Sequence, residues 1–75
     1  MMINLDKLPK EFGKKVKIER IKKDISQEQL AGMADLHRTT LGGIENGRNM
    51  PNLETIAKLA NALELSLSEI VDLKI

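Results

Sequence analysis

The sequence predicts an all-α fold, a compact domain of five short helices that spans residues 1–75. Apolar residues recur at intervals of three and four along most of the chain, which is the period of a helix with one buried face. Residues that favour helix starts and stops punctuate these stretches. No stretch alternates apolar and polar residues as a half-buried strand does, so no sheet is expected.

The first predicted helix begins near Pro9, because proline suits a first helical turn, where its missing N–H costs nothing. It runs to about residue 23. Phe12, Val16 and Ile21 are expected to form its buried stripe.

The second and third predicted helices are short and are separated by a tight turn. Ser26 and Gln29 form an S-x-x-Q capping box at the start of the second, in which each side chain satisfies a free backbone N–H. The third helix covers about residues 38–46 and stops at Gly47, the residue type favoured just past a helix end. Asp35, at the turn, is expected to take the left-handed conformation.

The fourth predicted helix is capped by Asn52. Its apolar residues follow helical spacing: Leu53, Ile56, Ala57, Leu59, Ala60 and Leu63. Ser66 and Glu69 form a second capping box, which opens a last helix over about residues 66–73.

The composition excludes several kinds of site. With no cysteine and one histidine, the chain lacks the usual zinc ligand sets, and we expect neither a metal nor another cofactor. It also offers no cysteine nucleophile, no second histidine and no phosphate-cradling glycine loop, so we expect no enzyme activity. No apolar run approaches the ~20 residues of a membrane span, and no signal peptide is evident, so a cytoplasmic location without a membrane partner is expected.

The net charge of +1 conceals an asymmetry. Residues 7–23 contain eight basic and two acidic residues, whereas residues 50–75 contain two basic and four acidic residues. A basic region of this kind suits an anionic partner such as nucleic acid, although a solvated lysine-rich helix face would have the same composition.

The most informative stretch is residues 27–46, QEQLAGMADLHRTTLGGIEN. Two short helices that cross closely need small residues at the contact, and Ala31 and Ala34 meet that need. This spacing resembles the Cro/repressor (XRE-type) helix-turn-helix family over about residues 12–71. The matching residues are Gln27, Leu30, Ala31, Ala34, Leu36, Leu41, Ile44, Glu45, Gly47 and Pro51.

The resemblance implies a lambda-repressor-like fold with a helix-turn-helix over about residues 26–46, and sequence-specific binding of double-stranded DNA for transcription regulation. In this family the second helix of the motif, here residues 38–46, enters the major groove with its first residues at base edges. Arg38, Thr39 and Thr40 are therefore the expected base contacts. His37 is expected to act as a weak helix cap.

The resemblance also implies which residues hold the DNA backbone and which hold the motif. Phosphate contacts are expected from Gln27 and Arg48, and from three weaker candidates, Asn46, Asn49 and Lys15. A structural ion pair between Arg20 and Glu45 is expected to join the first helix to the end of the third.

The glycine pair Gly42-Gly43 is unusual inside a helix, because each costs roughly 0.5–1 kcal/mol relative to alanine. Many relatives carry a long polar side chain at the position of Gly43, so base readout is expected to rest on the first turn of the helix. Close approach of the helix backbone to DNA, tight packing against a neighbouring helix, and poor helicity without purpose all remain open as explanations.

Family members act as homodimers on two-fold symmetric operators, and we expect the same here, on a palindromic or pseudopalindromic site. Leu67, Val71 and Ile75 are the expected interface, although the protomer's own core could take some of them. No small-molecule effector is expected, because the sequence ends where an effector domain would begin.

The segment HRTTLGGIE resembles the same region of restriction–modification controller proteins, and a phage repressor or an antitoxin partner fits nearly as well. The alternative from another class is a helical protein-interaction module that keeps the fold and does not bind DNA.

Overall fold

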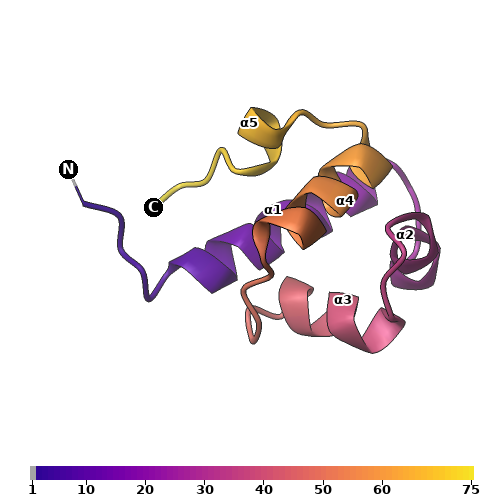
Figure 1. Cartoon of the computed structure of the whole chain (residues 1–75), viewed down its shortest axis with the longest axis horizontal. Coiled ribbons are helices and arrows are strands. Elements are labelled where there is room, and N and C mark those ends of the chain that lie inside the picture. The colour runs from indigo at the N-terminus through magenta and orange to yellow at the C-terminus, as the bar shows by residue number, and fades with distance from the viewer. Residues whose placement is uncertain (1) are drawn as a thin grey trace.

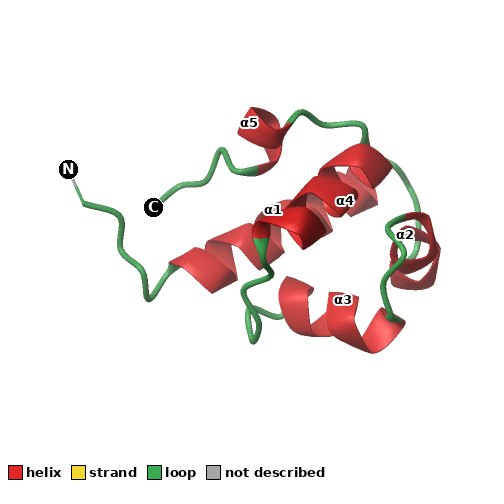
Figure 2. Ribbon diagram, in the orientation of Figure 1, coloured by secondary structure: helices red, strands yellow, loops and turns green. Residues whose placement is uncertain are grey.

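The computed structural model describes residues 2–75, and its regular structure consists of five α-helices without a strand in that range (Figures 1 and 2). The helices are α1 (Leu8–Lys22), α2 (Gln27–Met33), α3 (Arg38–Glu45), α4 (Leu53–Leu63) and α5 (Leu67–Ile70). The predicted all-α class and the order of the five helices are confirmed. None of these helices is both long and apolar enough to cross a membrane.

Helices α1 and α4 run through the middle of the molecule, and the other three surround them (Figure 1). Helix α3 lies along one edge and α5 along the opposite edge, while α2 is seen end-on beside α3 and α4. The segment before α1 extends away from the body, which gives the molecule a length of 36 Å and a width of 21–23 Å.

The core is aliphatic apart from Phe12, and all five helices contribute to it. Its fully buried large side chains are Phe12, Val16, Leu30, Leu41, Ile44, Leu59, Leu63 and Ile70. The expectation that Ile21 belongs to the stripe is wrong, since 57% of this residue is exposed. Five residues after Val16, Ile21 has turned away from the core, and its neighbour Arg20 faces the rest of the protein instead.

The helix starts and the turns follow the local signals. Both predicted capping boxes are present, at Ser26 and at Ser66, and Asn52 accepts a hydrogen bond from the Thr55 N–H at the start of α4. Asp35 is left-handed with φ 55°, as expected, so the tight turn between α2 and α3 is built as the sequence predicts.

Helix α5 is shorter than predicted, because it spans residues 67–70 rather than about 66–73. Its end is tightened by a hydrogen bond from the Asp72 N–H to the Glu69 carbonyl, which closes the last turn in the 3₁₀ manner. The chain then continues without regular structure, and Leu73 returns to pack against the core.

Candidate nucleic-acid interface

The first turn of α3 is exposed. The side chains of Arg38, Thr39 and Thr40 all face solvent, whereas Leu41 and Ile44 are buried on the opposite side of the helix. His37 occupies the N-cap position without a side-chain hydrogen bond, so it is a weak cap, as expected. Helix α3 therefore packs against the core through Leu41 and Ile44 and exposes a polar, basic first turn to solvent.

Glu45, at the end of α3, is the only charged residue in the buried set of residues 2–75. Its carboxylate accepts hydrogen bonds from Arg20 Nε at 2.8 Å and Arg20 Nη2 at 3.1 Å, so the expected ion pair is present. Arg20 Nη1 also donates to the Ile25 carbonyl at 2.9 Å. These hydrogen bonds to Glu45 raise the pKa of Arg20 above its ordinary value, which keeps its guanidinium protonated.

Gln27 joins the same network from the start of α2. Its Nε2 donates to Glu45 Oε1 at 3.0 Å, so one carboxylate links α1, α2 and α3. The glutamine side chain is half-buried, and its Oε1 lies beside Gly42. The hydrogen bond to Glu45 fixes the orientation of the Gln27 side chain and leaves the second N–H of its amide without a partner among the described residues. Phosphate binding by Gln27 stays a prediction.

Helix α1 touches the end of α3 backbone to backbone at Gly13. A Cβ atom at this position would collide with the carbonyl oxygens of Ile44 and Glu45. Gly13 is thus what allows α1 to lie close enough for Arg20 to reach Glu45. The only sign of this role in the sequence is a glycine inside a predicted helix, and the sequence analysis did not predict it.

The two glycines of α3 have different surroundings. A Cβ at Gly43 would meet the side-chain amide of Asn49, whereas a Cβ at Gly42 would meet nothing nearer than Gln27 Oε1, at 3.9 Å. Tight packing therefore explains Gly43, although the neighbour is a loop side chain and not a helix. The fold gives no reason for a glycine at residue 42.

Lys15 lies away from α3. It is half-buried, its Nζ is 3.7 Å from Glu19, and it borders a shallow hollow formed by α1 and the C-terminal segment. Together with the Ser66 hydrogen bonds, which have the larger effect, its charge lowers the pKa of Glu69 in α5. The structure therefore does not support Lys15 as a partner of α3 in phosphate binding.

Lys10 is the lysine of α1 that the structure places beside the loop after α3. Its Cα and Cγ atoms lie next to Gly47, within 3.0–3.1 Å of a Cβ built on that glycine. The lysine is exposed and adjoins the same loop as Arg48, which is also exposed. The sequence could not single it out, because α1 contains five lysines and nothing in the local sequence distinguishes Lys10 from the others.

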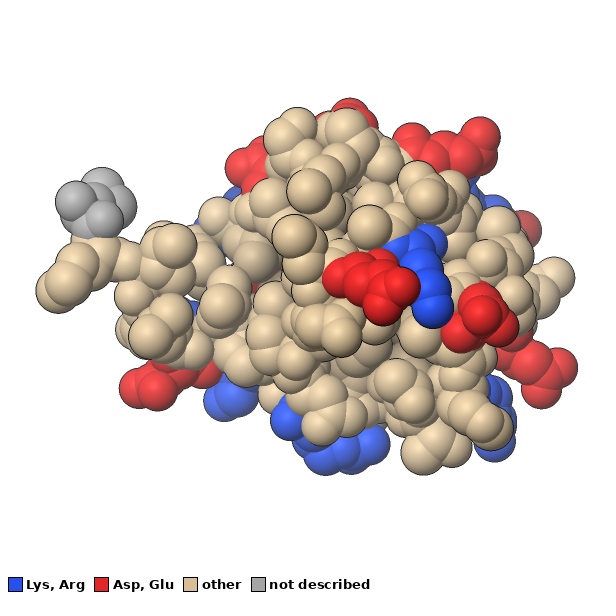
Figure 3. Space-filling view, in the orientation of Figure 1, with Lys and Arg blue, Asp and Glu red and all other residues tan. Residues whose placement is uncertain are grey.

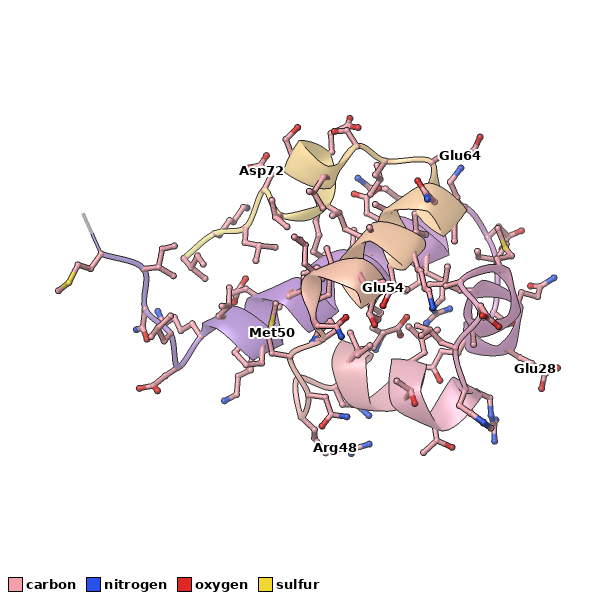
Figure 4. The ribbon with its side chains drawn as sticks, in the orientation of Figure 1. Glu28, Arg48, Met50, Glu54, Glu64 and Asp72 are labelled. Atoms are coloured by element: carbon pink, nitrogen blue, oxygen red, sulfur yellow. The ribbon has the colours of Figure 1, made fainter. Side chains whose placement is uncertain are left out.

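The two long edges of the molecule differ in charge. In Figure 4, Arg48 projects at the edge that carries α3, while Glu64 and Asp72 lie at the edge that carries α5. In the space-filling view, several basic side chains lie along the lower margin, with acidic ones at its left and right ends, and acidic side chains gather along the upper margin (Figure 3). The α3 edge is thus the basic one, with the exposed polar turn on it.

Comparisons with known proteins agree with this geometry. A family model described as helix-turn-helix matches residues 16–70, which is more than half of the chain. The chain belongs to the XRE-type helix-turn-helix family. Helices α2 and α3 and the tight turn between them lie within the matched residues and form a helix-turn-helix.

Several characterised proteins are similar over most of this helix-turn-helix chain. Control protein C.BamHI of Bacillus amyloliquefaciens is 40% identical over 62 residues, which are 81% of this chain and 76% of that protein. The immunity repressor protein of Bacillus phage phi105 is 39% identical over 79% of this chain and 41% of that protein. The restriction-modification controller protein C.AhdI of Aeromonas hydrophila superposes with a TM-score of 0.85 at 34% identity, over 91% of this chain and 99% of that one.

Apolar side chains remain exposed on α5, at the edge opposite the helix-turn-helix. Leu67 is 45% exposed and Val71 is 43% exposed, whereas Ile75 is half-buried. Leu65 and Ile70, from the same stretch, face the core. Leu67 and Val71 are therefore exposed, as a dimer interface requires, and Ile75 is partly exposed. Their role as an interface stays a prediction.

Proposed function

We propose that this chain is a sequence-specific, double-stranded DNA-binding transcriptional regulator that acts as a homodimer on a palindromic or pseudopalindromic operator. The observation that supports it best is the exposed first turn of α3, which carries Arg38, Thr39 and Thr40 on a helix anchored from behind. In the helix-turn-helix family this is the turn that meets base edges in the major groove.

Arg38 is the main base-reading residue of the proposal. A guanidinium can donate two hydrogen bonds to guanine O6 and N7, and such a pair discriminates against other bases by roughly 1–3 kcal/mol. Thr39 and Thr40 add hydroxyl groups for hydrogen bonds and methyl groups for contact with thymine.

The backbone contacts come from two segments beside α3. The start of α2, whose Gln27 side chain lies against Gly42 and Glu45, offers free N–H groups and the amide of Gln27 to a phosphate. In the loop after α3, Arg48 and the neighbouring Lys10 supply cations, and the exposed Asn46 adds an amide. A groove about 12 Å wide has a phosphate chain on each side, so the two sets would hold opposite strands.

A homodimer supplies the second half of the footprint. One short helix covers about half a turn of DNA, whereas two helices related by a two-fold axis reach half-sites about 34 Å apart. Leu67 and Val71 form the proposed interface, because exposed leucine and valine side chains gain by being withdrawn from water.

Selection of binding sites from random duplexes tests this function. We expect a palindromic consensus with half-site centres about one helical turn apart, and a guanine in each half-site. Arg38→Ala should relax the preference at that guanine and leave the fold intact. Failure to enrich any duplex at low salt would contradict the proposal and favour a protein-interaction role for the same fold.

A further inference from the structure

The loop after α3 folds back onto the helix and is fixed there by its backbone. The N–H groups of Arg48 and Asn49 both donate to the Gly43 carbonyl, at 2.9 and 3.4 Å, and the Gly47 N–H donates to the Ile44 carbonyl at 3.1 Å. Gly47 has φ 76°, a conformation that glycine adopts without strain. Residue 49 is therefore held at a defined place over the end of α3.

The side chain of Asn49 covers Gly43. Its Nδ2 and Cγ atoms occupy the space that a side chain on Gly43 would enter, with Cγ 3.5 Å from the position of a Cβ there. Gly43 is buried as a result, while Asn49 itself is exposed. The side-chain amide of Asn49 forms no hydrogen bond with another group of residues 2–75, so neither its donor nor its acceptor is used inside the protein.

This amide lies on the outward surface of α3. Gly43 follows Thr39 by four residues and Thr40 by three, and residues at these spacings share a helix face. Both threonines are exposed, and Asn46, three residues beyond Gly43, is exposed as well. The amide of Asn49 therefore joins the surface that starts with the first turn of α3.

We infer that Asn49 reads a base, and that it takes the place of the long side chain that residue 43 lacks. This inference rests on the proposed function and replaces the expectation that Asn49 contacts phosphate. A primary amide matches adenine, because it can accept from N6 and donate to N7 in the major groove at once. A phosphate contact would use only the donor, and it would not need the amide to lie over Gly43 on the outward face of the helix.

Substitution of Asn49 gives the first test. Binding of Asn49→Ala to the selected duplex, and to duplexes changed at each position, is compared with wild type at one salt concentration. We expect the wild-type preference for adenine at one position of each half-site to fall by roughly 10-fold to 100-fold, as for other bidentate pairs. Asn61→Ala, which removes an exposed asparagine of α4, should leave all preferences unchanged.

Substitution of Gly43 gives an independent second test. A methyl group at this position displaces only the end of a flexible side chain, so Gly43→Ala should fold normally and turn the Asn49 amide away. We expect it to lose the same adenine preference as Asn49→Ala, and the double variant should lose no more than either single one. Gly32→Ala in α2, where nothing lies within 4 Å, is the matched control.

Two results would overturn the inference while the proposed function stands. In one, Asn49→Ala weakens binding to all duplexes alike and flattens the salt dependence, which would assign the residue to phosphate. In the other, both variants keep every base preference of the wild type. If wild-type protein binds no duplex, the proposed function fails and the inference fails with it.

Discussion

At the scale of single residues, the surroundings of each glycine decide its role, and the sequence does not show those surroundings. A Cβ at Gly13 would meet backbone, one at Gly43 would meet the end of a side chain, and one at Gly42 would make only an ordinary van der Waals contact with Gln27 Oε1. All three are interior helix positions and look alike as letters. Only the tertiary contacts show that Gly13 is required for the packing of α1 on α3, whereas Gly42 can be replaced by alanine.

Alanine at these positions should therefore act in opposite directions. Gly13→Ala forces apart two backbones and should lower the free energy of unfolding by about 1–3 kcal/mol or more. Gly42→Ala should raise it by roughly 0.5–1 kcal/mol, because alanine favours the helix and nothing obstructs it. Urea denaturation measures both. A destabilised Gly42→Ala would contradict the room that the structure shows for a methyl group at residue 42.

Lysines of α1 should also differ in their effect on DNA binding. Removing one phosphate contact lowers the slope of log affinity against log salt by about 0.9, so Lys10→Ala and Arg48→Ala should each flatten the salt dependence. Lys15→Ala should not, because Lys15 lies toward α5. The three slopes are measured by fluorescence anisotropy with one duplex. Equal slopes for Lys10→Ala and Lys15→Ala would contradict this division of α1.

Local signals predicted more of the fold than of the site. The capping boxes and the left-handed Asp35 follow from short-range chemistry, so the sequence predicts them correctly. The apolar spacing of α4 predicts most of its buried face, but Leu53 in the first turn is 63% exposed, and the buried Ala62 is missing from the predicted set. Whether Ile21 and Lys15 face the core or solvent depends on which side of α1 packs against α3. The sequence of α1 has no clear apolar periodicity that would identify this side. The role of Asn49 depends on how a loop folds back.

At the scale of elements, the helix-turn-helix is held in place by one buried carboxylate. Glu45 accepts hydrogen bonds from Arg20 on α1 and from Gln27 on α2, so three helices meet at its two oxygens. The side chain of Glu45 is fully buried, and a buried charge is tolerated only while it is paired. The network therefore fixes the orientation of α3 relative to α1 and α2, and with it the direction in which Arg38 projects.

Loss of Arg20 should be costly for this reason. Arg20→Met leaves the Glu45 carboxylate buried without its cation and should lower the free energy of unfolding by about 3–5 kcal/mol. Lys22→Met, which removes an exposed partner of Glu19, should cost about 1 kcal/mol or less. In urea denaturation the double variant Arg20→Met/Glu45→Met should recover part of the loss. A double variant less stable than Arg20→Met would contradict the account.

At the scale of the whole molecule, the two long edges differ in chemistry. The α3 edge is basic and carries the exposed polar turn, while the α5 edge is acidic and carries exposed apolar residues (Figures 3 and 4). In the proposed dimer, a second copy would bind at α5 without covering α3. Acidic residues near α5 would disfavour the approach of that edge to DNA.

A charge at the α5 edge should separate the subunits without unfolding them. Leu67→Asp or Val71→Asp buries a carboxylate in the proposed interface, so the dimer dissociation constant should rise by at least about tenfold. Ile21→Asp, at an apolar residue of α1 that is more exposed than either, should leave the dimer dissociation constant unchanged. Sedimentation equilibrium measures all three. Unchanged dimers in both α5 variants would place the interface elsewhere.

We expect Arg38 and the first turn of α3 to contact base edges in the major groove, and duplexes with modified bases test this directly. At the guanine of the selected site, 7-deazaguanine lacks the N7 acceptor in the major groove, and inosine lacks the amino group in the minor groove. The account predicts that 7-deazaguanine weakens wild-type binding by roughly 10-fold or more, that Arg38→Ala is insensitive to it, and that inosine has little effect. Strong sensitivity to inosine together with none to 7-deazaguanine would contradict it.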